Sequence, residues 1–467
     1  MSPGGGESAA AEPRSVCPVC LRPIPARHET LAGETFLVKA CPEHGEFRTV
    51  VWRGEPDFYA WARPKIPSPP RHPFTRASRG CPLDCGLCDA HRQHTCTALI
   101  EVTWRCDLGC PVCFASSGKV APPDPSPAAV ARLLDRVVEA SGRCNLQLSG
   151  GEPTVRDDLP DLIRLAKSRG FPFVQLNTNG LRIGREPGYA RTLAEAGLDS
   201  VFLQFDGTGD PVYARLRGRP LLPVKLAALD ALAEAGIGIV LVPTVAPGVN
   251  DHDLGAIIRL AAARSPAVRG VHFQPVSYFG RYPEAPDDAA RITLPEIMRA
   301  LVEQTGGAMR LNHFTPPGCE HSHCSFHANY VVGEDGALHR LGEGGGCGCT
   351  PGSASRPARP ASEGADKSKA FVKRQWVAPA LDPAPEKLSP MAPRDDLDRF
   401  LARAATHTLA VSAMAFQDCW TLDLERLRGC CIHEVSPDGR LIPFCAYNLT
   451  SMSGETLYRG RCDDPEA

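Results

Sequence analysis

The chain has 467 residues, of which 43% are hydrophobic and 22% are charged, and its formal net charge is −2. This length allows two or three domains, and the balanced charge provides no basic field that would favour a nucleic-acid partner. No apolar run approaches the roughly 18 residues of a transmembrane helix.

The twenty cysteines are the unusual feature of the composition. They occur in short-spaced groups in a large chain whose first fifteen residues lack the basic start and apolar core of a signal peptide. This pattern favours metal sites over disulfides and predicts a reducing, cytoplasmic location. Residues 1–15 are expected to form a disordered tail.

Residues 16–62 contain two short knuckles with metal-ligand spacing. The first pairs Cys17 with Cys20, and the second pairs Cys41 with His44. Three cysteines and one histidine are a common tetrahedral zinc set. A rubredoxin-like iron site uses similar knuckles, so the pattern predicts a small metal-binding domain with one mononuclear zinc or iron.

Residues 63–98 combine a proline-rich connector with a second cysteine group. Four cysteines can hold a closed 4Fe-4S cluster, and we predict a first auxiliary cluster on Cys81, Cys85, Cys88 and Cys96. His91 and His94 lie between these cysteines and are expected to be exposed loop histidines.

The central motif is a C-x3-C-x2-C run formed by Cys106, Cys110 and Cys113, directly after an apolar strand pattern at 99–104. Three thiolates on one loop can hold three irons of a 4Fe-4S cube and leave the fourth iron open for a small chelating cofactor. On its own, the run is also compatible with a zinc loop or with a four-cysteine electron-transfer cluster.

A glycine motif formed by Gly150, Gly151 and Glu152 follows the next predicted strand. Glycines let the backbone approach a ligand closely, because no Cβ intervenes. The Glu152 carboxylate can accept charge-assisted hydrogen bonds from an ammonium group. Of the two C-x3-C-x2-C runs, only the second follows a strand and precedes this motif, so it is favoured as the open cluster.

Residues 99–315 alternate between strand and helix patterns. The predicted strands lie at 99–104, just before Gly150, and at 173–177, 200–206, 237–245 and 270–276. Such alternation indicates a parallel sheet with right-handed crossovers. Six units, compared with the eight of a closed barrel, predict an α/β fold, a partial (β/α)6 TIM-like barrel.

In parallel α/β sheets, ligands bind at the carboxyl ends of the strands. Polar residues at these ends are therefore candidate cofactor contacts: Asn177, Asn179, Asp206, Thr244 and Gln274. Asp206, which ends the fourth strand, is the preferred contact among them.

Residues 316–467 are predicted to form a C-terminal domain with a second auxiliary cluster. Its candidate ligands are Cys319, Cys324, Cys445 and one of the vicinal cysteines Cys430 and Cys431. Within this domain, residues 350–395 are rich in proline, alanine, serine and lysine and are predicted to be a flexible linker.

Five cysteines remain outside these sets. Cys144 has no close cysteine partner in the sequence and is predicted to be a small buried apolar residue. The others are predicted to be structural or without a role: Cys347, Cys349, Cys419 and Cys462.

The cluster run, the glycine motif and the partial barrel resemble the radical S-adenosylmethionine (SAM) enzymes. In that family, the methionine amino and carboxylate groups of SAM occupy the open iron, and the glycine motif cradles the amino group. The knuckles, the run at 81–88 and the segment 443–448 are similar to a narrower group containing the archaeal tetraether lipid synthase and the class D radical SAM methyltransferases. The resemblance spans 16–349 and 397–455.

The resemblance implies cleavage of SAM to a 5′-deoxyadenosyl radical, hydrogen abstraction from an unactivated carbon and carbon–carbon bond formation. The substrate is a pterin-like or other small molecule that receives a methyl or methylene group, or a lipid whose alkyl chains are coupled. The implied cofactors are the open 4Fe-4S cluster, SAM, one or two auxiliary 4Fe-4S clusters and one mononuclear metal. A reductase, ferredoxin or flavodoxin would donate electrons, and contact with a membrane surface stays open.

Two alternatives remain. A radical SAM peptide maturase also carries auxiliary clusters near its C-terminus, but here the metal knuckles occupy the place of a leader-peptide module. A non-catalytic iron–sulfur or zinc scaffold protein is disfavoured by the intact Glu152 and by the complete cluster motif.

Overall fold

The computed structural model describes residues 14–70, 72–118, 121–342, 358–379 and 396–460. Their strands form a four-stranded antiparallel sheet, a twelve-stranded mixed sheet and one short strand pair. The helices are α1 (Phe58–Trp61), α2 (Pro127–Ser141), α3 (Leu159–Ser168), α4 (Leu181–Arg185), α5 (Tyr189–Glu195), α6 (Asp210–Arg217), α7 (Leu222–Glu234), α8 (Leu254–Ala263), α9 (Leu294–Gln304), α10 (Ala361–Trp376), α11 (Asp396–Thr406), α12 (Leu424–Arg428) and α13 (Phe444–Tyr447).

The N-terminal sheet carries the two knuckles. Its strands follow chain order: β1 (Arg14–Val16), β2 (Pro23–Leu31), β3 (Glu34–Cys41) and β4 (Gly45–Arg53). Ser15 is fully buried, and its hydroxyl donates to the backbone carbonyl of Leu422 at 2.5 Å. The prediction of a tail through residue 15 is therefore wrong at its last two residues, and residues 1–13 lie outside the described part of the chain.

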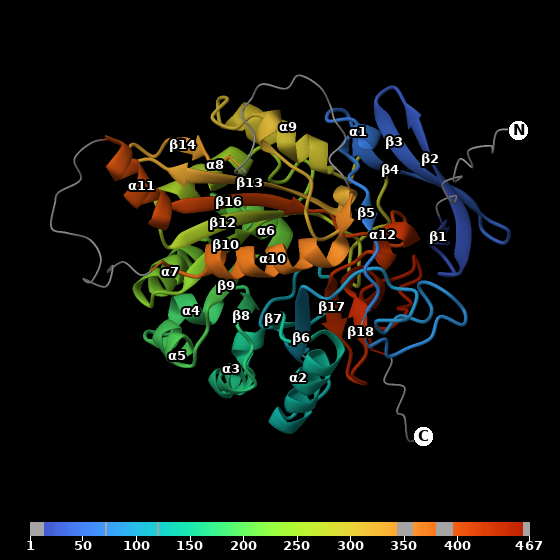
Figure 1. Cartoon of the computed structure of the whole chain (residues 1–467), viewed down its shortest axis with the longest axis horizontal. Helices are drawn as coiled ribbons and strands as arrows, with labels where there is room; N and C mark the ends of the chain where they lie inside the picture. Colours follow the sequence, from blue (N-terminus) through green and yellow to red (C-terminus); the bar gives the residue numbers. More distant parts are fainter. Residues whose placement is uncertain (1–13, 71, 119–120, 343–357, 380–395, 461–467) are drawn as a thin grey trace, which may run out of the picture.

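Six neighbouring parallel strands form the centre of the large sheet, as the alternating sequence pattern predicts. In sheet order they are β6 (Thr97–Thr103), β7 (Asn145–Gly150), β8 (Val174–Thr178), β9 (Ser200–Gln204), β10 (Gly238–Val242) and β12 (Val268–Pro275). Figure 1 shows them as an open arc, with α2, α3, α5 and α7 along its outer side. The partial barrel is thereby confirmed.

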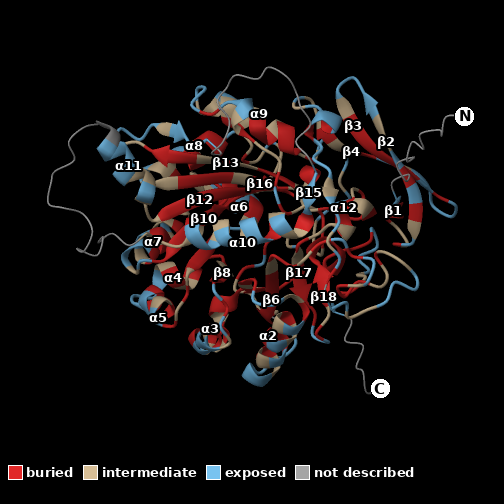
Figure 2. Cartoon of the chain, in the orientation of Figure 1, coloured by how far each residue is buried: buried red, intermediate tan, exposed pale blue. Residues whose placement is uncertain are grey.

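Helix α2 shows how the sequence builds these units. Ser126 caps it, because its Oγ accepts the backbone N–H of Ala129 at 3.2 Å, and Pro127 fills the first turn, where no intrahelical donor is needed. The apolar stripe that includes Val130 and Leu134 faces the sheet and is fully buried. Figure 2 shows the same division for the outer helices, with buried inner faces and exposed outer faces.

Both edges of the six-stranded core are extended by C-terminal strands. Beside β12 lie β16 (Thr408–Met414), β13 (Ser325–Val332) and β14 (Leu338–Arg340), and beside β6 lie β17 (Ile432–Val435) and β18 (Leu441–Pro443), while β11 (Thr244–Val245) pairs with β12. The C-terminal region, predicted as a separate domain, is instead part of the barrel sheet. Local patterns could not show this, because the partners lie far apart in the chain.

Helix α10 falls within the segment predicted to be a flexible linker, so that prediction is wrong for residues 359–376. Figure 1 shows α10 crossing in front of β9 and β10. It lies where the strands begin: Gln375 accepts through its backbone carbonyl from Arg269, and the Cys96 sulfur approaches the carbonyl of Ala365 at 3.8 Å. The helix therefore closes the amino end of the barrel. Residues 350–357 and 380–395 lie outside the described residues.

Just before α10, β15 (Arg359–Pro360) pairs in parallel with β5 (Lys65–Ile66), which lies in the proline-rich connector. Among the helices of the described ranges, none combines the length and apolar character needed to cross a membrane.

Candidate active site and metal centres

A large cavity of about 2120 Å³ occupies the inside of the arc. Its walls include the cluster loop and the glycine motif at the carboxyl ends of the strands, and the inner face of α10 at their amino ends. Ligand pockets commonly have volumes of about 300–1,000 Å³, so this cavity has room for more than one small molecule.

The cluster loop follows β6 directly and lines the cavity with all three of its cysteines, Cys106, Cys110 and Cys113. Arg281 fastens the loop, because its Nε donates to the carbonyl of Cys110 at 2.9 Å and its backbone exchanges hydrogen bonds with Cys113. Cys106 accepts the backbone N–H of Leu108 at 3.4 Å. The loop is thus held in place at the cavity wall.

The two glycines pack the neighbouring loop against this one. A Cβ at Gly150 would lie 2.0 Å from the carbonyl oxygen of Thr103, and a Cβ at Gly151 would lie 2.2 Å from that of Arg105. Gly150 also has φ +133°, which side-chain-bearing residues rarely adopt. The glycines are therefore required by the close approach of two backbones, in addition to any approach to a ligand.

Glu152 lies at the cavity wall and is almost fully buried. Its Oε1 accepts hydrogen bonds from the backbone and hydroxyl of Thr154 and from the Thr178 hydroxyl, and its Oε2 accepts from the backbone of Asn179 at 2.6 Å. Burial raises the pKa of Glu152, although these hydrogen bonds oppose the rise. The carboxylate already joins the ends of β7 and β8.

Asn179 and Asn177 lie at the end of β8. Asn179 donates from Nδ2 to the Asp107 carboxylate at 2.7 Å and so ties its loop to the cluster loop. Asn177 lines the cavity, and its buried Oδ1 has no hydrogen-bond partner among the described residues. A buried acceptor without a donor is costly, which makes Asn177 a candidate ligand contact.

Asp206 does not line the cavity and cannot be the direct contact that the sequence pattern favours. It is fully buried behind Arg217, whose Nε and Nη2 donate to its two carboxylate oxygens at 2.8 and 2.7 Å. Arg217 itself lines the cavity and donates to the hydroxyl of Thr244 at 3.0 Å. Sequence reasoning missed Arg217 because it lies at the end of helix α6, away from any strand terminus.

A second buried cation lies behind the same wall. The Nζ of Lys225 donates to the carbonyl and side-chain oxygens of Gln204, both at 2.9 Å, and to the carbonyl of Asn179. Burial lowers the pKa of Lys225 to about 8. Gln274 and Thr244, both predicted as contacts, lie on the cavity surface.

The four knuckle ligands meet at the open end of the N-terminal sheet. The ligand atoms of Cys17, Cys20, Cys41 and His44 all lie within 4.8 Å of one another. Desolvation opposes the thiolate form of Cys41, but hydrogen bonds from the backbone N–H of Glu43 and from the His44 ring lower the pKa of Cys41 to about 6. These are the donor types and the spacing that a tetrahedral ion requires.

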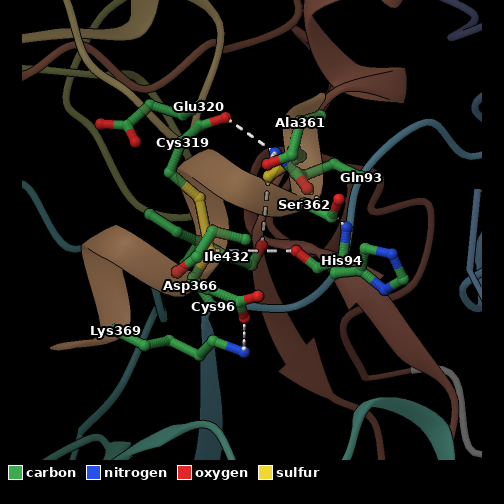
Figure 3. Close-up of a disulfide and its surroundings, with 12 residues drawn as sticks. Gln93, His94, Cys96, Cys319, Glu320, Ala361, Ser362, Asp366, Lys369 and Ile432 are labelled. Atoms are coloured by element: carbon green, nitrogen blue, oxygen red, sulfur yellow. Dashed lines mark hydrogen bonds and ion pairs between the residues drawn. A yellow bond between two sulfur atoms is a disulfide. The ribbon is translucent and has the colours of Figure 1, made fainter. Parts of the chain in front are cut away.

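The remaining cysteines group differently from the prediction. We call Cys96, Cys319 and Cys431 the cavity set: they are buried, line the cavity and have sulfurs within 4.8 Å of one another. Figure 3 shows the first two joined beside α10, with Gln93 close by. Their Cα atoms are 7.7 Å apart, beyond the usual disulfide range of about 4.4–6.8 Å. Cys96 is thus grouped with Cys319 and Cys431.

Two further sets remain. The loop set consists of Cys81, Cys85 and Cys88. Cys81 lies close enough to both of the others to influence the pKa of their thiols or to be influenced by it. In the C-terminal set, the pKa of Cys430 is raised by burial and then by the neighbouring Cys445 and Cys324. Cys431 belongs to the cavity set, whereas Cys430 lies near Cys445 and Cys324. One vicinal cysteine therefore lies with Cys324 and Cys445, while Cys319 lies in the cavity set.

His91, expected to be exposed, is buried instead. Its Nε2 lies 2.7 Å from the carbonyl oxygen of Cys430 and 3.3 Å from Nε2 of the buried His433. Cys144 is fully buried, as predicted, and so is Cys419. Cys347, Cys349 and Cys462 lie outside the described residues.

Comparisons with known proteins agree with the two local motifs. Residues 100–261 match the radical SAM superfamily, and residues 10–53 match the HMPTM N-terminal zinc ribbon domain. The first match contains the cluster loop and the glycine motif, and the second contains all four knuckle ligands. The chain is a radical SAM enzyme with an N-terminal zinc ribbon, whose chemistry uses SAM and a 4Fe-4S cluster. For the knuckles, the match favours zinc over iron.

The chain is similar over nearly its whole length to the 7,8-dihydro-6-hydroxymethylpterin dimethyltransferase of Methanocaldococcus jannaschii. The two chains are 36% identical over 484 residues, which cover 93% of this chain and 92% of the relative. The protein belongs to the family of that dimethyltransferase.

Other matches cover less of the chain. A probable GTP 3′,8-cyclase of Methanothermobacter thermautotrophicus is 28% identical over 36% of this chain and 53% of its own. The structure of Streptococcus suis SuiB bound to the precursor peptide SuiA is 15% identical, with a TM-score of 0.39 over 46% of each chain. Similarity at that level carries no argument about the substrate.

Proposed function

We propose that this enzyme transfers methyl groups to carbon atoms of a pterin-like heterocycle. The proposal rests on the extent of the similarity to the pterin dimethyltransferase, which includes the zinc ribbon and the C-terminal region. When bound, SAM and the open cluster supply the radical chemistry, while the chain orients the reactants and excludes water.

The cavity lining is mainly apolar and carries several polar side chains, a combination that suits a heterocycle with hydrogen-bonding groups. Asn177 and Asn329 line the cavity, and the Oδ1 atom of each is buried without a hydrogen-bond partner in the described structure. His272 also lines the cavity, and its Nδ1 lies 2.8 Å from the hydroxyl of Ser412. Burial lowers the pKa of His272 to about 4, so the ring is neutral at physiological pH.

For SAM, we propose three contact regions at the carboxyl ends of the strands. Cys106, Cys110 and Cys113 would hold the cluster, and the main chain of the Gly150–Gly151 loop would receive the methionine ammonium group. Glu152 would position this loop, because all four of its hydrogen bonds are already made within the chain. Asn177, Asn179, Thr244 and Gln274 would contact the rest of SAM. Arg217 adds a cation beside the cluster loop, where it can face a carboxylate.

We further propose that the loop set and the C-terminal set each hold an auxiliary cluster and that the cavity set supplies the additional thiolates. The nine cysteines exceed the eight that two closed 4Fe-4S clusters need. Three buried nitrogens that lack a hydrogen-bond partner in the described residues belong to side chains around the auxiliary cysteines: Arg426 Nε, Arg428 Nε and His433 Nδ1. A reductase, ferredoxin or flavodoxin would supply electrons in a cytoplasmic setting.

The test is an anaerobic assay of the reconstituted full chain with SAM as the radical source, a methylene-bearing folate-like compound as the one-carbon donor, dithionite as the reductant and 7,8-dihydro-6-hydroxymethylpterin as the acceptor. We expect about twelve cluster irons and one zinc per chain, 5′-deoxyadenosine, and a pterin product heavier by one or two methylene units. Cys110→Ala should abolish deoxyadenosine formation and keep the auxiliary iron. Deoxyadenosine formed without any change in the pterin would contradict the proposed substrate class, whereas no deoxyadenosine in the wild type would contradict the site.

A further inference from the structure

Helix α12 lies between two of the cysteine sets and presents one arginine to each. Asp423 caps the helix, because its Oδ1 accepts the backbone N–H groups of Glu425 and Arg426 at 2.8 and 3.4 Å. The cap sets the direction of a short helix whose inward face is buried through Leu424 and Leu427.

Arg426 points to the C-terminal set. Its Nη2 donates to the Cys324 sulfur at 3.5 Å and to the carbonyl of Ala415 at 3.3 Å, while its buried Nε has no partner among the described residues. Only 9% of the residue is exposed. A guanidinium in this position needs more negative charge and more acceptors than neutral thiols provide.

Arg428 points to the loop set. Its Nη1 donates to Glu425 at 2.7 Å, and its Nε is buried without a partner in the described structure. Its carbonyl accepts the backbone N–H of Arg92 in the segment that follows Cys88, and its side chain lies near Cys81. The helix therefore offers unused N–H donors on both sides, where the sulfides of iron–sulfur clusters would be acceptors.

We propose that Arg426 and Arg428 donate hydrogen bonds to the sulfurs of the two auxiliary clusters and raise their reduction potentials, so that α12 sets both potentials. A cluster becomes more negative when it takes up one electron, and a fixed cation or N–H donor stabilises that form. The inference rests on the proposed auxiliary clusters and is independent of the pterin substrate.

The test is a redox titration of the anaerobically reconstituted full chain with dithionite as the electron source, followed by electron paramagnetic resonance without SAM. Cys445→Ala and Cys85→Ala identify the signal of each auxiliary cluster by its loss. Arg426→Gln should then shift the first signal to a more negative midpoint, equivalent to a roughly tenfold or greater loss in the equilibrium constant for reduction. Arg428→Gln should do the same to the second.

Arg164→Gln, on the exposed face of α3, is the matched control and should leave all midpoints unchanged. Unchanged midpoints in both α12 variants at full iron content would overturn the proposal, as would the absence of either auxiliary signal in the wild type.

A second measurement has its main readout in the wild-type protein. Reduced wild-type protein carrying nitrogen-15-labelled arginine should show nitrogen hyperfine coupling to the auxiliary clusters, and Arg426→Lys should lose the coupling assigned to the C-terminal set. A wild type without such coupling would contradict the proposal, whatever the outcome of the methyl-transfer assay.

Discussion

The buried carboxylate of Asp206 holds Arg217, a residue that lines the cavity, in an ion pair. Asp206 is fully buried and neutralises a guanidinium that is itself only slightly exposed, with 11% of its side chain accessible. Removing one partner of a buried pair leaves an uncompensated charge, which costs far more than an exposed pair contributes.

We therefore predict that Asp206→Asn lowers the free energy of unfolding by about 3–5 kcal/mol. The measurement is a urea titration of the metal-loaded protein. Asp230→Asn removes the partner of Arg264 in an exposed pair on the outer side, and a loss of at most about 1 kcal/mol is expected there. Equal losses in the two variants would contradict the role of burial.

Glu434 provides a pH-dependent prediction at the same scale. It is 1% exposed, its Oε1 has no partner in the described structure, and burial, followed by the nearby Glu101, raises the pKa of its carboxyl well above the ordinary value. An acid with a raised folded-state pKa binds its proton more tightly when folded. Below the pKa that this carboxyl has in the unfolded chain, it is protonated in both states and does not change the free energy of unfolding. As the pH rises from that value toward the pKa in the folded protein, the free energy of unfolding decreases.

Glu434→Gln should therefore become more stable than the wild type as the pH increases. Urea titrations at about pH 6 and about pH 9 measure the difference in the free energy of unfolding between the two proteins. This difference should grow with pH, because only the wild type releases a proton from this group on unfolding, and a higher pH favours that release. A difference that is the same at both values would show that Glu434 is ionised in the native protein.

Among the structural elements, helix α10 is one that the sequence does not predict, in contrast to the local metal and glycine motifs. The cluster run, the knuckles and the glycine motif can be predicted because their residues are close in the chain and their spacing reflects one local geometry. Helix α10 has few apolar residues and is flanked by proline-rich chain, and its position depends on contacts with β7, β10 and β12. Likewise, Cys96 meets Cys319, which lies 223 residues further along the chain, so no local spacing in the sequence indicates this contact.

Trp376, on α10, contacts Phe202 inside the barrel with ring centroids 4.9 Å apart. We predict that Trp376→Ala opens the amino end of the cavity to water, so that deoxyadenosine forms in excess over methylated product. The ratio of the two products in the anaerobic assay measures this uncoupling. Lys373→Ala, on the exposed side of the same helix, should keep the wild-type ratio, and an unchanged ratio in both variants would contradict the role of Trp376 in closing the barrel.

At the scale of the whole molecule, the zinc ribbon is bound to the barrel through several buried contacts. Lys39 is 1% exposed, and its Nζ donates to the carbonyl of Cys419 at 2.7 Å, while Arg53 donates to backbone carbonyls at Asp288 and Arg291. The ribbon is therefore part of the folded enzyme.

Cys20→Ser together with Cys41→Ser should remove about one zinc per chain without loss of iron, because these ligands lie apart from the iron–sulfur sets. The same variant should have a lower unfolding midpoint, since the folding free energy that the metal supplies to the ribbon is lost. Elemental analysis and thermal unfolding measure both effects. Loss of iron in proportion to zinc would contradict the separation of the sites.

The extension of the barrel sheet by C-terminal strands has a consequence for synthesis on the ribosome. The first barrel strand, β6, receives its outer neighbour β17 only after more than three hundred further residues have been made. Until then, one edge of the sheet is unpaired, and such distant pairing is slow to form. Because Cys430, Cys431 and Cys445 also belong to this late segment, the cavity set and the C-terminal set are completed long after the loop set, whose three cysteines precede β6.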